Sequence, residues 1–248
     1  MCGRFVLDRK TTDLVDLFDV DVVGETMPEP SWNIAPTRQI SIVLDSLPKP
    51  KGEDDFPEPV RRLESARWGL VPGWAKESNA GPPLFNARSE DAAEKASFGN
   101  AVKKRRAVIP ASGYYEWQVV DGVKVPHYMS LPGDELLLFA GLYEWWRNPA
   151  AAHDDPNKWL LSSTILTRSS TGALEEIHDR MPVFLDQDLF EEWLDPQEEG
   201  SQQLIDQVVD GAREVELRID HHEVDKSVGS VQNDSQQLTA PARPAPVT

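Results

Sequence analysis

Residues 107–131, AVIPASGYYEWQVVDGVKVPHYMSL, predict a β-hairpin near the middle of the chain. Both halves are rich in β-branched and aromatic residues, which favour strands. The pair Asp121-Gly122 separates the halves, and Asp-Gly suits the type I′ turn that joins two antiparallel strands. We therefore expect extended chain over residues 107–117 and a returning strand over residues 123–131.

Further strands are expected on both sides of this hairpin. They cover residues 38–45, 61–68, 136–145, 159–167 and 214–219. Apolar residues at helical spacing predict a short helix from Thr12 and further helices over residues 89–96, 170–177, 186–194 and 202–209. This succession indicates an α+β fold, with mostly antiparallel strands in a sheet or barrel-like core and helices at its periphery.

Two segments do not follow these patterns. Residues 46–60 are acidic and rich in proline, which predicts an exposed insertion or the tip of a hairpin. After Lys226 the chain is rich in Ser, Gln, Pro and Ala and has no apolar periodicity. Such a composition is typical of disordered chain, so residues 226–248 are predicted to form a disordered tail.

The charge of the chain is unevenly distributed. The 248 residues carry 25 Lys and Arg against 42 Asp and Glu, a formal net charge of −17, which argues against a protein that binds nucleic acid with its whole surface. Residues 61–125, however, carry 11 basic and 7 acidic side chains interleaved with aromatic residues. Basic groups neutralise phosphates and aromatic rings stack on unpaired bases, so this island suits single-stranded nucleic acid. The alternative is a solvated strand surface beside core aromatics.

Composition also limits the compartment and the kinds of site. The sequence has no run of about 18 apolar residues and no signal-peptide pattern at its start, so we expect a cytoplasmic protein without a membrane partner. Cys2 is the only cysteine, which excludes an internal disulfide and a multi-cysteine metal site.

Cys2 is chemically unusual because it directly follows the initiator methionine. Removal of Met1 would make it a 1,2-aminothiol, with an α-amine whose pKa is about 8 and which is partly neutral near pH 7. Such an amine condenses with an aldehyde to a Schiff base, and the neighbouring thiol can close on the same carbon to form a thiazolidine. The alternative is that Cys2 is an incidental small residue.

Seven motifs along the chain resemble those of the SRAP family of abasic-site processing proteins, and they occur in the family's order. They are MCGRF at residues 1–5, WNIAPT at 32–37, RWGLVP at 67–72, FNARSE at 85–90, RRAVIPA at 105–111, GYYEW at 113–117 and HDRMP at 178–182. Each motif is weak alone, but together they span about four-fifths of the chain. The resemblance implies one SRAP domain over residues 2–225.

The resemblance also implies an activity. A member of this family recognises an abasic site in single-stranded DNA and joins the ring-opened aldehyde covalently to its N-terminal cysteine through a thiazolidine, which shields the lesion. This agrees with the chemistry expected of Cys2. The reaction needs no cofactor and no metal, and a monomer suffices for it. The covalent bond would also retain DNA where the acidic surface weakens electrostatic attraction.

Four residues would carry the chemistry, as the resemblance implies. Cys2 would be the nucleophile, and Asn86 would orient the N-terminus through hydrogen bonds that add no charge. Glu116 would transfer protons during Schiff-base formation, because its aromatic neighbours can raise its pKa by desolvation. An ion pair with an arginine is the alternative for Glu116. His178 would act on the sugar, in ring opening and in release of the cross-link.

A further group would contact DNA, again by resemblance. Arginine side chains would bind the phosphates beside the lesion, because their planar fork matches phosphate oxygens. These are Arg4, Arg88 and Arg180, with Arg105 or Arg106 adding a contact. Trp68 would stack against neighbouring bases or belong to the core, and Asn33 and Pro36 would shape the wall around Cys2. The histidines outside the motifs, His127, His153, His221 and His222, are expected to be ordinary strand or surface groups.

Three other functions compete with this one. A thiol peptidase could use Cys2, Glu116 and His178, and could coexist with a DNA role by removing Met1. Amidotransferases with an N-terminal nucleophile also begin Met-Cys-Gly, but their glycine-rich downstream motifs are absent here. A non-catalytic reader of damaged DNA would use the basic island and leave the motif around Cys2 unexplained.

Overall fold

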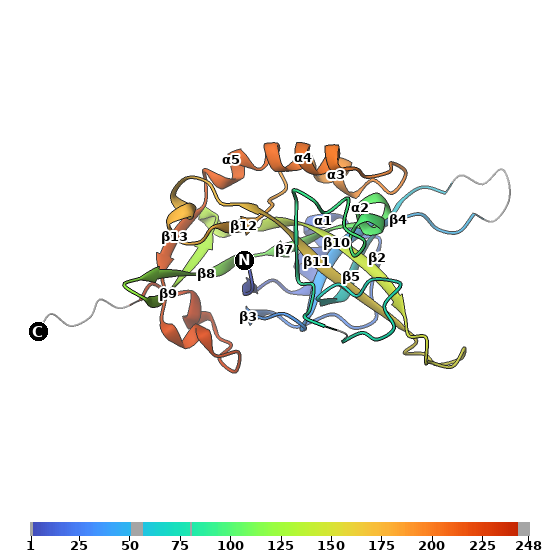
Figure 1. The fold of residues 1–248 in the computed structure, drawn as a ribbon, viewed down its shortest axis with the longest axis horizontal. Coiled ribbons are helices and arrows are strands. Elements are labelled where there is room, and N and C mark those ends of the chain that lie inside the picture. Colours follow the sequence, from blue (N-terminus) through green and yellow to red (C-terminus); the bar gives the residue numbers. More distant parts are fainter. Residues whose placement is uncertain (1, 51–56, 80, 243–248) are drawn as a thin grey trace, which may run out of the picture.

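The computed structural model describes residues 2–50, 57–79 and 81–242. Two β-sheets with helices at their edges make up the fold, which confirms the predicted α+β class (Figure 1). Within the described ranges, every helix is too short or too polar to cross a membrane.

The first sheet contains the N-terminus and the predicted hairpin. Its order is β13-β9-β8-β1-β3, and every pair in it is antiparallel. The bounds are β1 Phe5–Leu7, β3 Ser31–Ile34, β8 Gly113–Val120, β9 Val123–Ser130 and β13 Asp220–Glu223. Val120 pairs with Val123, so the loop has two residues. Asp121 and Gly122 both have positive φ, as a type I′ turn requires, and the hairpin prediction is confirmed.

The second sheet closes into a barrel. Its order is β12-β11-β10-β7-β4-β5-β2, and β11 also pairs with β5 and β6 in parallel, which joins the two ends of the five-strand path from β11 to β5. The bounds are β2 Val22–Val23, β4 Gln39–Ser46, β5 Val60–Trp68, β6 Asn86–Arg88, β7 Arg106–Ala111, β10 Leu137–Arg147, β11 Trp159–Ser169 and β12 Arg180–Pro182. The chain predicted to be extended over residues 107–117 is thus two strands, and it passes from the barrel to the other sheet at Ser112.

The helices are short and lie at the periphery (Figure 1). They are α1 Thr11–Phe18, α2 Gly99–Lys104, α3 Phe190–Leu194, α4 Gln202–Gly211 and α5 Arg213–Glu216, with 3-10 turns at Pro132–Asp134, Gly172–Glu176, Lys226–Gly229 and Gln236–Thr239. Two predictions are wrong. Residues 89–96 form turns that precede α2. Residues 214–216 belong to α5, residues 217–219 follow it without strand structure, and a strand starts only at Asp220.

Aromatic packing holds the short strand β1 against the barrel. The ring of Phe5 meets the indole of Trp68 edge to face at 5.1 Å between centroids, and it meets the ring of Phe139 at 6.0 Å. All three side chains are completely buried. Burying rings of this size stabilises a core by several kcal/mol in total, roughly 2 for each ring. The packing fixes the position of the residues that precede Phe5.

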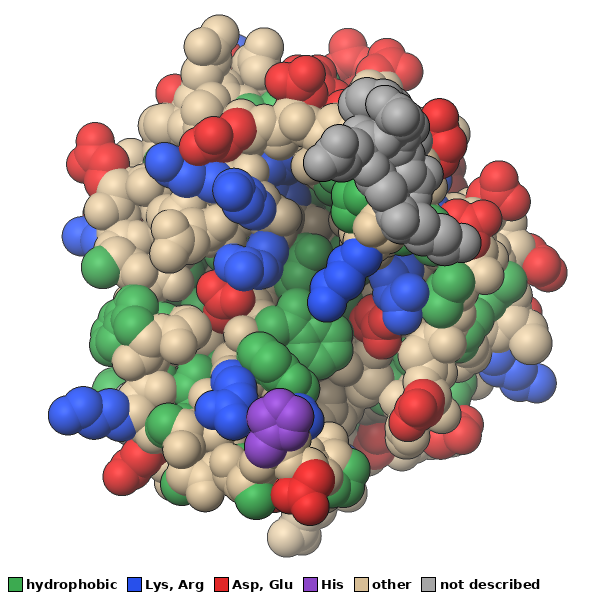
Figure 2. All heavy atoms as spheres, turned by 90° about the vertical axis from the view of Figure 1, so that its right-hand side faces the viewer, with side chains coloured by type: hydrophobic (Ala, Val, Ile, Leu, Met, Phe, Trp, Pro, Cys, Tyr) green, Lys and Arg blue, Asp and Glu red, His purple; other side chains and the backbone are tan. Residues whose placement is uncertain are grey.

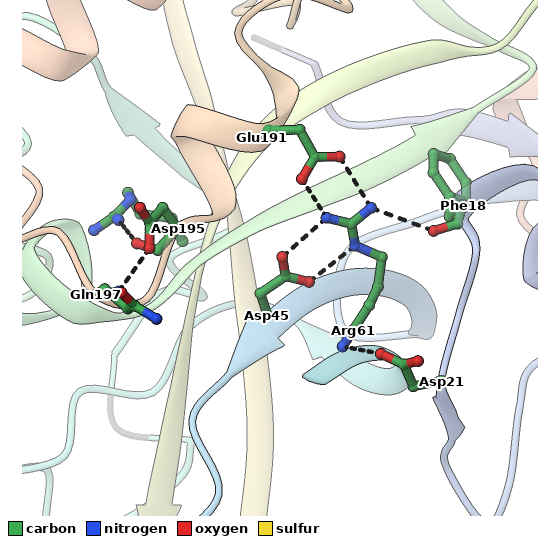
Figure 3. A network of polar contacts seen from close by, with 8 residues as sticks. Phe18, Asp21, Asp45, Arg61, Glu191, Asp195 and Gln197 are labelled. Carbon is green, nitrogen blue, oxygen red and sulfur yellow. Dashed lines mark hydrogen bonds and ion pairs between the residues drawn. The ribbon is translucent and has the colours of Figure 1, made fainter. Parts of the chain in front are cut away.

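Part of the basic island is used inside the fold. The guanidinium of Arg61 bonds bidentately to Asp45 on β4, at 2.9 Å, and to Glu191 on α3, at 2.6 and 3.1 Å (Figure 3). It also lies 5.1 Å from the centre of the Phe190 ring. Arg61 therefore joins the barrel to α3 and is unavailable to a DNA phosphate.

The C-terminal segment is ordered as far as residue 242, so the prediction of a disordered tail is wrong for residues 226–242. Val228 and Leu238 are buried in a small cluster with Val6 and Tyr115 of the first sheet. Polar contacts add to this packing, because Asp234 accepts hydrogen bonds from the Ser31 hydroxyl and the Trp32 N–H. Residues 243–248 lie outside the described residues.

The acidic, proline-rich segment connects β4 to β5. These two strands pair antiparallel from Gln39 opposite Arg67 to Ser46 opposite Val60. Residues 47–59 therefore join neighbouring strand ends, and residues 51–56 among them lie outside the described residues.

Candidate active site

Cys2 lies where the first sheet meets the barrel. It is completely buried, three residues before Phe5, which pairs with Tyr114 on β8. The N–H of Tyr115 donates to the carbonyl of Arg4 at 2.9 Å, so the chain at residues 2–4 runs along the same strand. Glu116 follows on β8 and is also buried. The fold therefore brings together two of the residues that the sequence predicts for the chemistry.

Asn86 reaches Cys2 from the barrel. Its Nδ2 atom donates a hydrogen bond of 2.7 Å to the Cys2 backbone carbonyl. Its Oδ1 atom is buried and has no hydrogen-bond partner within the described ranges. Because a buried amide oxygen without a partner costs free energy, this atom is suited to accept a hydrogen bond from a group that binds later.

The carboxyl of Glu116 is prepared for proton transfer. Burial raises its pKa to about 7, and the negative charge of Asp179 acts in the same direction. The acid is therefore partly protonated at neutral pH and can act as a donor or an acceptor. Burial also raises the pKa of the Cys2 thiol, and so does the negative charge of Glu116. The thiol remains protonated and neutral at rest.

His178 lies in the turn before β12, and its side chain is 29% exposed. Its Nδ1 atom accepts a hydrogen bond of 3.0 Å from the Arg180 N–H and lies 2.9 Å from a carboxylate oxygen of Asp179. Burial lowers its pKa, so the neutral ring dominates at pH 7. The neutral ring has one nitrogen whose electron pair can accept a proton, and one N–H, which can donate a hydrogen bond.

Arg88 and Arg180 form a basic pair near Asn86. Arg180 bonds bidentately to Glu90, at 2.6 and 2.9 Å, and also to the Thr167 carbonyl. The pKa of Glu90 is lowered by this hydrogen bond and by the charges of Arg180 and Arg88, so both guanidinium groups lie close to one carboxylate. Arg88 is exposed. This pair is suited to bind a phosphate beside Cys2.

Arg4 and Asn33 hold the C-terminal segment. Arg4 donates to the Asn33 side chain and to the Val228 carbonyl, both at 2.7 Å, and lies 5.8 Å from the centre of a Trp117 ring. The buried amide of Asn33 donates to carbonyls of residues 228, 230 and 233. The hydrogen bonds of Asn33 thus go to Arg4 and to the chain's own backbone, and its predicted place in the wall around Cys2 stays a prediction. Pro36 is partly exposed in the turn between β3 and β4.

Trp68 and Arg106 belong to the interior, which for Trp68 is one of the two alternatives that the sequence left open. The indole of Trp68 is 0% exposed, and its N–H donates to the Phe85 carbonyl at 2.8 Å, so it cannot stack on a base. The buried guanidinium of Arg106 donates to backbone carbonyls around α2 and α3. These are the carbonyls of Trp193, Val102, Lys103, Asp195 and Glu198. Its charge is used to connect these helices.

The basic run at residues 103–106 lies away from Cys2. The six residues of β7 lead from Arg106 to Ala111, a length of about 20 Å, and only the next residue, Ser112, bonds to Val6 of β1. Arg105 forms an ion pair with Glu144 at 3.1 Å. The predicted DNA contact from Arg105 or Arg106 is therefore not part of the site around Cys2.

Lys103 and Lys104 line a pocket of about 460 Å³ together with Asp45, Glu198 and Glu199. Figure 2 views the end of the molecule where β4 and β5 are connected, and Lys and Arg side chains surround a hollow there, with Asp and Glu side chains beside them. Because both positively and negatively charged side chains line this pocket, it does not favour the binding of a polyanion.

One neighbour of Glu116 was not considered in the sequence analysis of the site. His127 pairs directly with Glu116 across the hairpin. The signal was present in the sequence, because a two-residue turn at Asp121-Gly122 places residue 120 opposite 123 and therefore 116 opposite 127. In the part of the chain that the structure describes, no group of three or more His, Cys, Asp and Glu side chains could hold a metal ion.

Comparison with known proteins identifies relatives. Residues 1–231 match the family described as SOS response associated peptidase (SRAP). The abasic site processing protein YoqW of Bacillus subtilis is 37% identical over 201 residues, which cover 79% of this chain and 81% of that protein. The abasic site processing protein HMCES of Xenopus tropicalis is 33% identical over 189 residues, which cover 67% of this chain and 54% of that protein.

The fold also occurs in a solved structure. A crystal structure of a protein from Bacteroides thetaiotaomicron matches with a TM-score of 0.76 and 19% identity, and the match covers 98% of this chain and 100% of that one. At this level of identity, the similarity concerns the fold alone.

Proposed function

This chain belongs to the SOS response associated peptidase (SRAP) family, and from this we propose that it processes abasic sites in DNA. In detail, we propose that Cys2, once Met1 has been removed, captures the aldehyde of an abasic site in single-stranded DNA as a thiazolidine. The observation that carries the proposal is the position of Cys2, which is hydrogen-bonded by Asn86 and lies beside a buried carboxyl whose pKa is about 7. Relatives named abasic site processing proteins support it.

The proposed reaction balances in protons. The Cys2 amine adds to the aldehyde to give a carbinolamine, and protonated Glu116 donates a proton to its hydroxyl. Water leaves as the C–O bond breaks, and the nitrogen lone pair forms an iminium ion. The neutral thiol then gives its proton to the Glu116 carboxylate while sulfur bonds to the iminium carbon. The ring closes, Glu116 is protonated again, and one water is the by-product.

Two further groups support this chemistry. His178 is neutral at rest and is suited to accept the proton of the sugar hydroxyl as the ring opens, and to return it from the imidazolium when the cross-link is released. The Oδ1 of Asn86, which has no partner among residues 2–50, 57–79 and 81–242, is suited to accept a hydrogen bond from the amine of a processed Cys2.

The contact with DNA is assigned to the basic pair of Arg88 and Arg180. Arg88 is exposed, and Arg180 forms an ion pair with Glu90. Both guanidinium groups lie close to the Glu90 carboxylate. A phosphate entering here would replace Glu90 as the partner of one guanidinium, so its binding is expected to weaken with salt. Arg4 adds a positive charge two residues from Cys2. One copy of the chain contains every group that this proposal uses, and we expect a cytoplasmic monomer.

The thiol peptidase is the weaker reading of the same residues. A peptidase of this type attacks with a thiolate, whose formation requires a lowered thiol pKa. Burial and the charge of Glu116 instead raise the pKa of Cys2. A neutral thiol that delivers its proton to a neighbouring carboxylate fits addition to an iminium ion, which is a much stronger electrophile than a peptide carbonyl.

The test is the intact mass of the protein after incubation with a single-stranded oligonucleotide that carries one abasic site. The sample must first be shown by mass to lack Met1. We expect an adduct with the mass of protein plus oligonucleotide minus one water, stable to heat and denaturant. Cys2→Ala should give none, and Cys2→Ser should not give the heat-stable ring. If Met1-free wild-type protein forms no adduct, the proposal is wrong.

A further inference from the structure

His127 lies beside Glu116 on the face of the first sheet that carries Cys2. The two residues are directly opposite in the β8–β9 ladder. Side chains of directly opposite residues in an antiparallel pair point to the same face, with Cβ atoms about 5 Å apart. His127 is 6% exposed, so its ring is covered as Glu116 is.

Both ring nitrogens of His127 are buried and lack a hydrogen-bond partner among the described residues. A buried imidazole in this state is unfavourable, so the arrangement needs a physical reason. Glu116 lies on the neighbouring strand β8, directly opposite His127, and its carboxyl is on the same face of the sheet. It can exchange a hydrogen bond with His127 through a side-chain rotation or one bridging water.

On its other side, His127 faces the edge strand β13 (Figure 1). The rings of His127 and His221 lie 5.5 Å apart between centroids, and Glu223 is directly opposite His127 in the β9–β13 ladder. His221 and Glu223 are exposed. His222 points to the opposite face, where its Nε2 bonds to the Thr239 carbonyl, although its charge still reaches His127. A row of titratable groups thus extends from buried Glu116 to solvent.

Burial acts on the two central groups in opposite directions. It lowers the pKa of His127 and raises the pKa of Glu116 to about 7, because each group disfavours its own charged form when desolvated. These shifts remove the usual difference by which a histidine holds its proton more tightly than a glutamate, so the proton is not confined to the imidazole.

We propose that His127 is a positioning residue that shares the proton of Glu116 and exchanges it with solvent through His221 at the β13 edge. The inference deepens the proposed function, on which its catalytic consequence rests. In each exchange Glu116 loses or gains one proton, His127 takes it up or supplies it, and water at β13 balances the transfer. A molecule in which Glu116 is ionised when DNA covers Cys2 can thus be brought to the acid form that the first proton transfer needs.

The direct test uses the DNA-free protein and the titration of two labelled groups, so it does not depend on cross-linking. Carbon-13 NMR follows the Glu116 carboxyl and nitrogen-15 NMR follows the His127 ring in the wild type. We expect both probes to show the same two inflections, as coupled groups do. Two independent single inflections would overturn the proposal, and this result needs no variant that might fail to fold.

Variants add a second readout. His127→Phe removes the imidazole N–H that can hydrogen-bond to ionised Glu116, so the pKa of Glu116 should rise by about half a unit or more. His127→Gln keeps a hydrogen-bonding side chain but cannot titrate, and it should leave Glu116 with one inflection. His153→Gln, on an exposed loop, should change nothing. An unchanged Glu116 titration in folded His127→Phe would also overturn the proposal.

Cross-linking separates the two proposals from each other. If the wild type forms the adduct, the pH at which its rate falls by half should move upward with the Glu116 titration in His127→Phe. An adduct with an unshifted profile would refute the role of His127 and leave the proposed function intact. Coupled titration in a protein that forms no adduct would refute the proposed function and leave the coupling of His127 to Glu116 intact.

Discussion

The side-chain amide of Asn86 donates a 2.7 Å hydrogen bond to the backbone carbonyl of Cys2, and so connects a barrel strand to the start of the chain. Asn86 pairs with Ile165 on β11, in the interior of the barrel wall, and is therefore rigidly placed. Cys2 is separated from β1 by Gly3 and Arg4 and lies outside the paired residues of that strand. The bond therefore adds to the packing of Phe5 in holding Cys2 in place.

Loss of this hydrogen bond should slow cross-linking. Asn86→Ala removes a bond of about 1 kcal/mol and frees the N-terminus, so we expect adduct formation to slow about tenfold. Asn86→Asp should be at least as slow, because a carboxylate cannot donate to the carbonyl. Single-turnover rates with abasic oligonucleotide measure both. The control is Asn79→Ala on an exposed loop, and a wild-type rate for Asn86→Ala would show that the bond does not position Cys2.

The local parts of this arrangement are predictable from the sequence. The Asp121-Gly122 turn determines the hairpin and its register by the backbone conformation of two residues, and no distant contact is needed. The motif around Asn86 and the chemistry of Cys2 likewise depend on adjacent residues. The register that follows from this turn also places His127 opposite Glu116, and the sequence prediction did not apply it.

Burial was not predictable in the same way. Trp68 and Arg106 lie in motifs rich in functional residues, but whether such a side chain faces DNA or the interior depends on strands far along the chain. The segment after Lys226 has few apolar residues, and it is ordered because Asn33, nearly 200 residues earlier, binds its carbonyls. Composition describes the average segment and does not detect such a partner.

Glu116 should make the folded protein less stable as pH rises. Burial raises its folded-state pKa from an ordinary 4.5 to about 7. Between these values the folded protein holds a proton that the unfolded chain has lost, so the free energy of unfolding falls as pH increases through this window. Glu116→Gln removes this pH dependence. Between pH 4 and pH 8, the free energy of unfolding of the variant should therefore rise relative to that of the wild type by up to about 3 kcal/mol.

Urea unfolding of both proteins at pH 4, 6 and 8 measures this difference. Glu175→Gln, an exposed glutamate on the turn before His178, serves as the control and should follow the wild type. A constant difference between Glu116→Gln and the wild type at all three values would mean that the Glu116 pKa is not raised.

The C-terminal segment should contribute to stability through Leu238. This side chain is 4% exposed in the cluster that also contains Val228. Leu238→Ala should lower the free energy of unfolding by about 2–4 kcal/mol, as expected for a truncated buried leucine. Gln237→Ala, at an exposed neighbouring position, should cost less than about 0.5 kcal/mol. Equal stabilities of the two variants would indicate that the segment is detached in solution.

Trp68 should matter for folding and not for DNA affinity. Its indole is 0% exposed, and its N–H donates to the Phe85 carbonyl. Trp68→Phe leaves this carbonyl without its donor and creates a small cavity, so we expect a loss of roughly 2 kcal/mol in urea unfolding. An exposed ring that stacked on a base would instead contribute about 1–3 kcal/mol to DNA binding.

The two roles are separated by measuring noncovalent affinity in a Cys2→Ala background, with a single-stranded oligonucleotide that carries a tetrahydrofuran abasic analogue and so offers no aldehyde. Adding Trp68→Phe should change the fluorescence anisotropy Kd by less than about twofold, because the buried indole does not reach the DNA. Adding Arg88→Ala should weaken binding and reduce its salt dependence by about one phosphate contact. A tenfold loss of affinity in Trp68→Phe with unchanged stability would mean that the indole leaves the core to meet DNA.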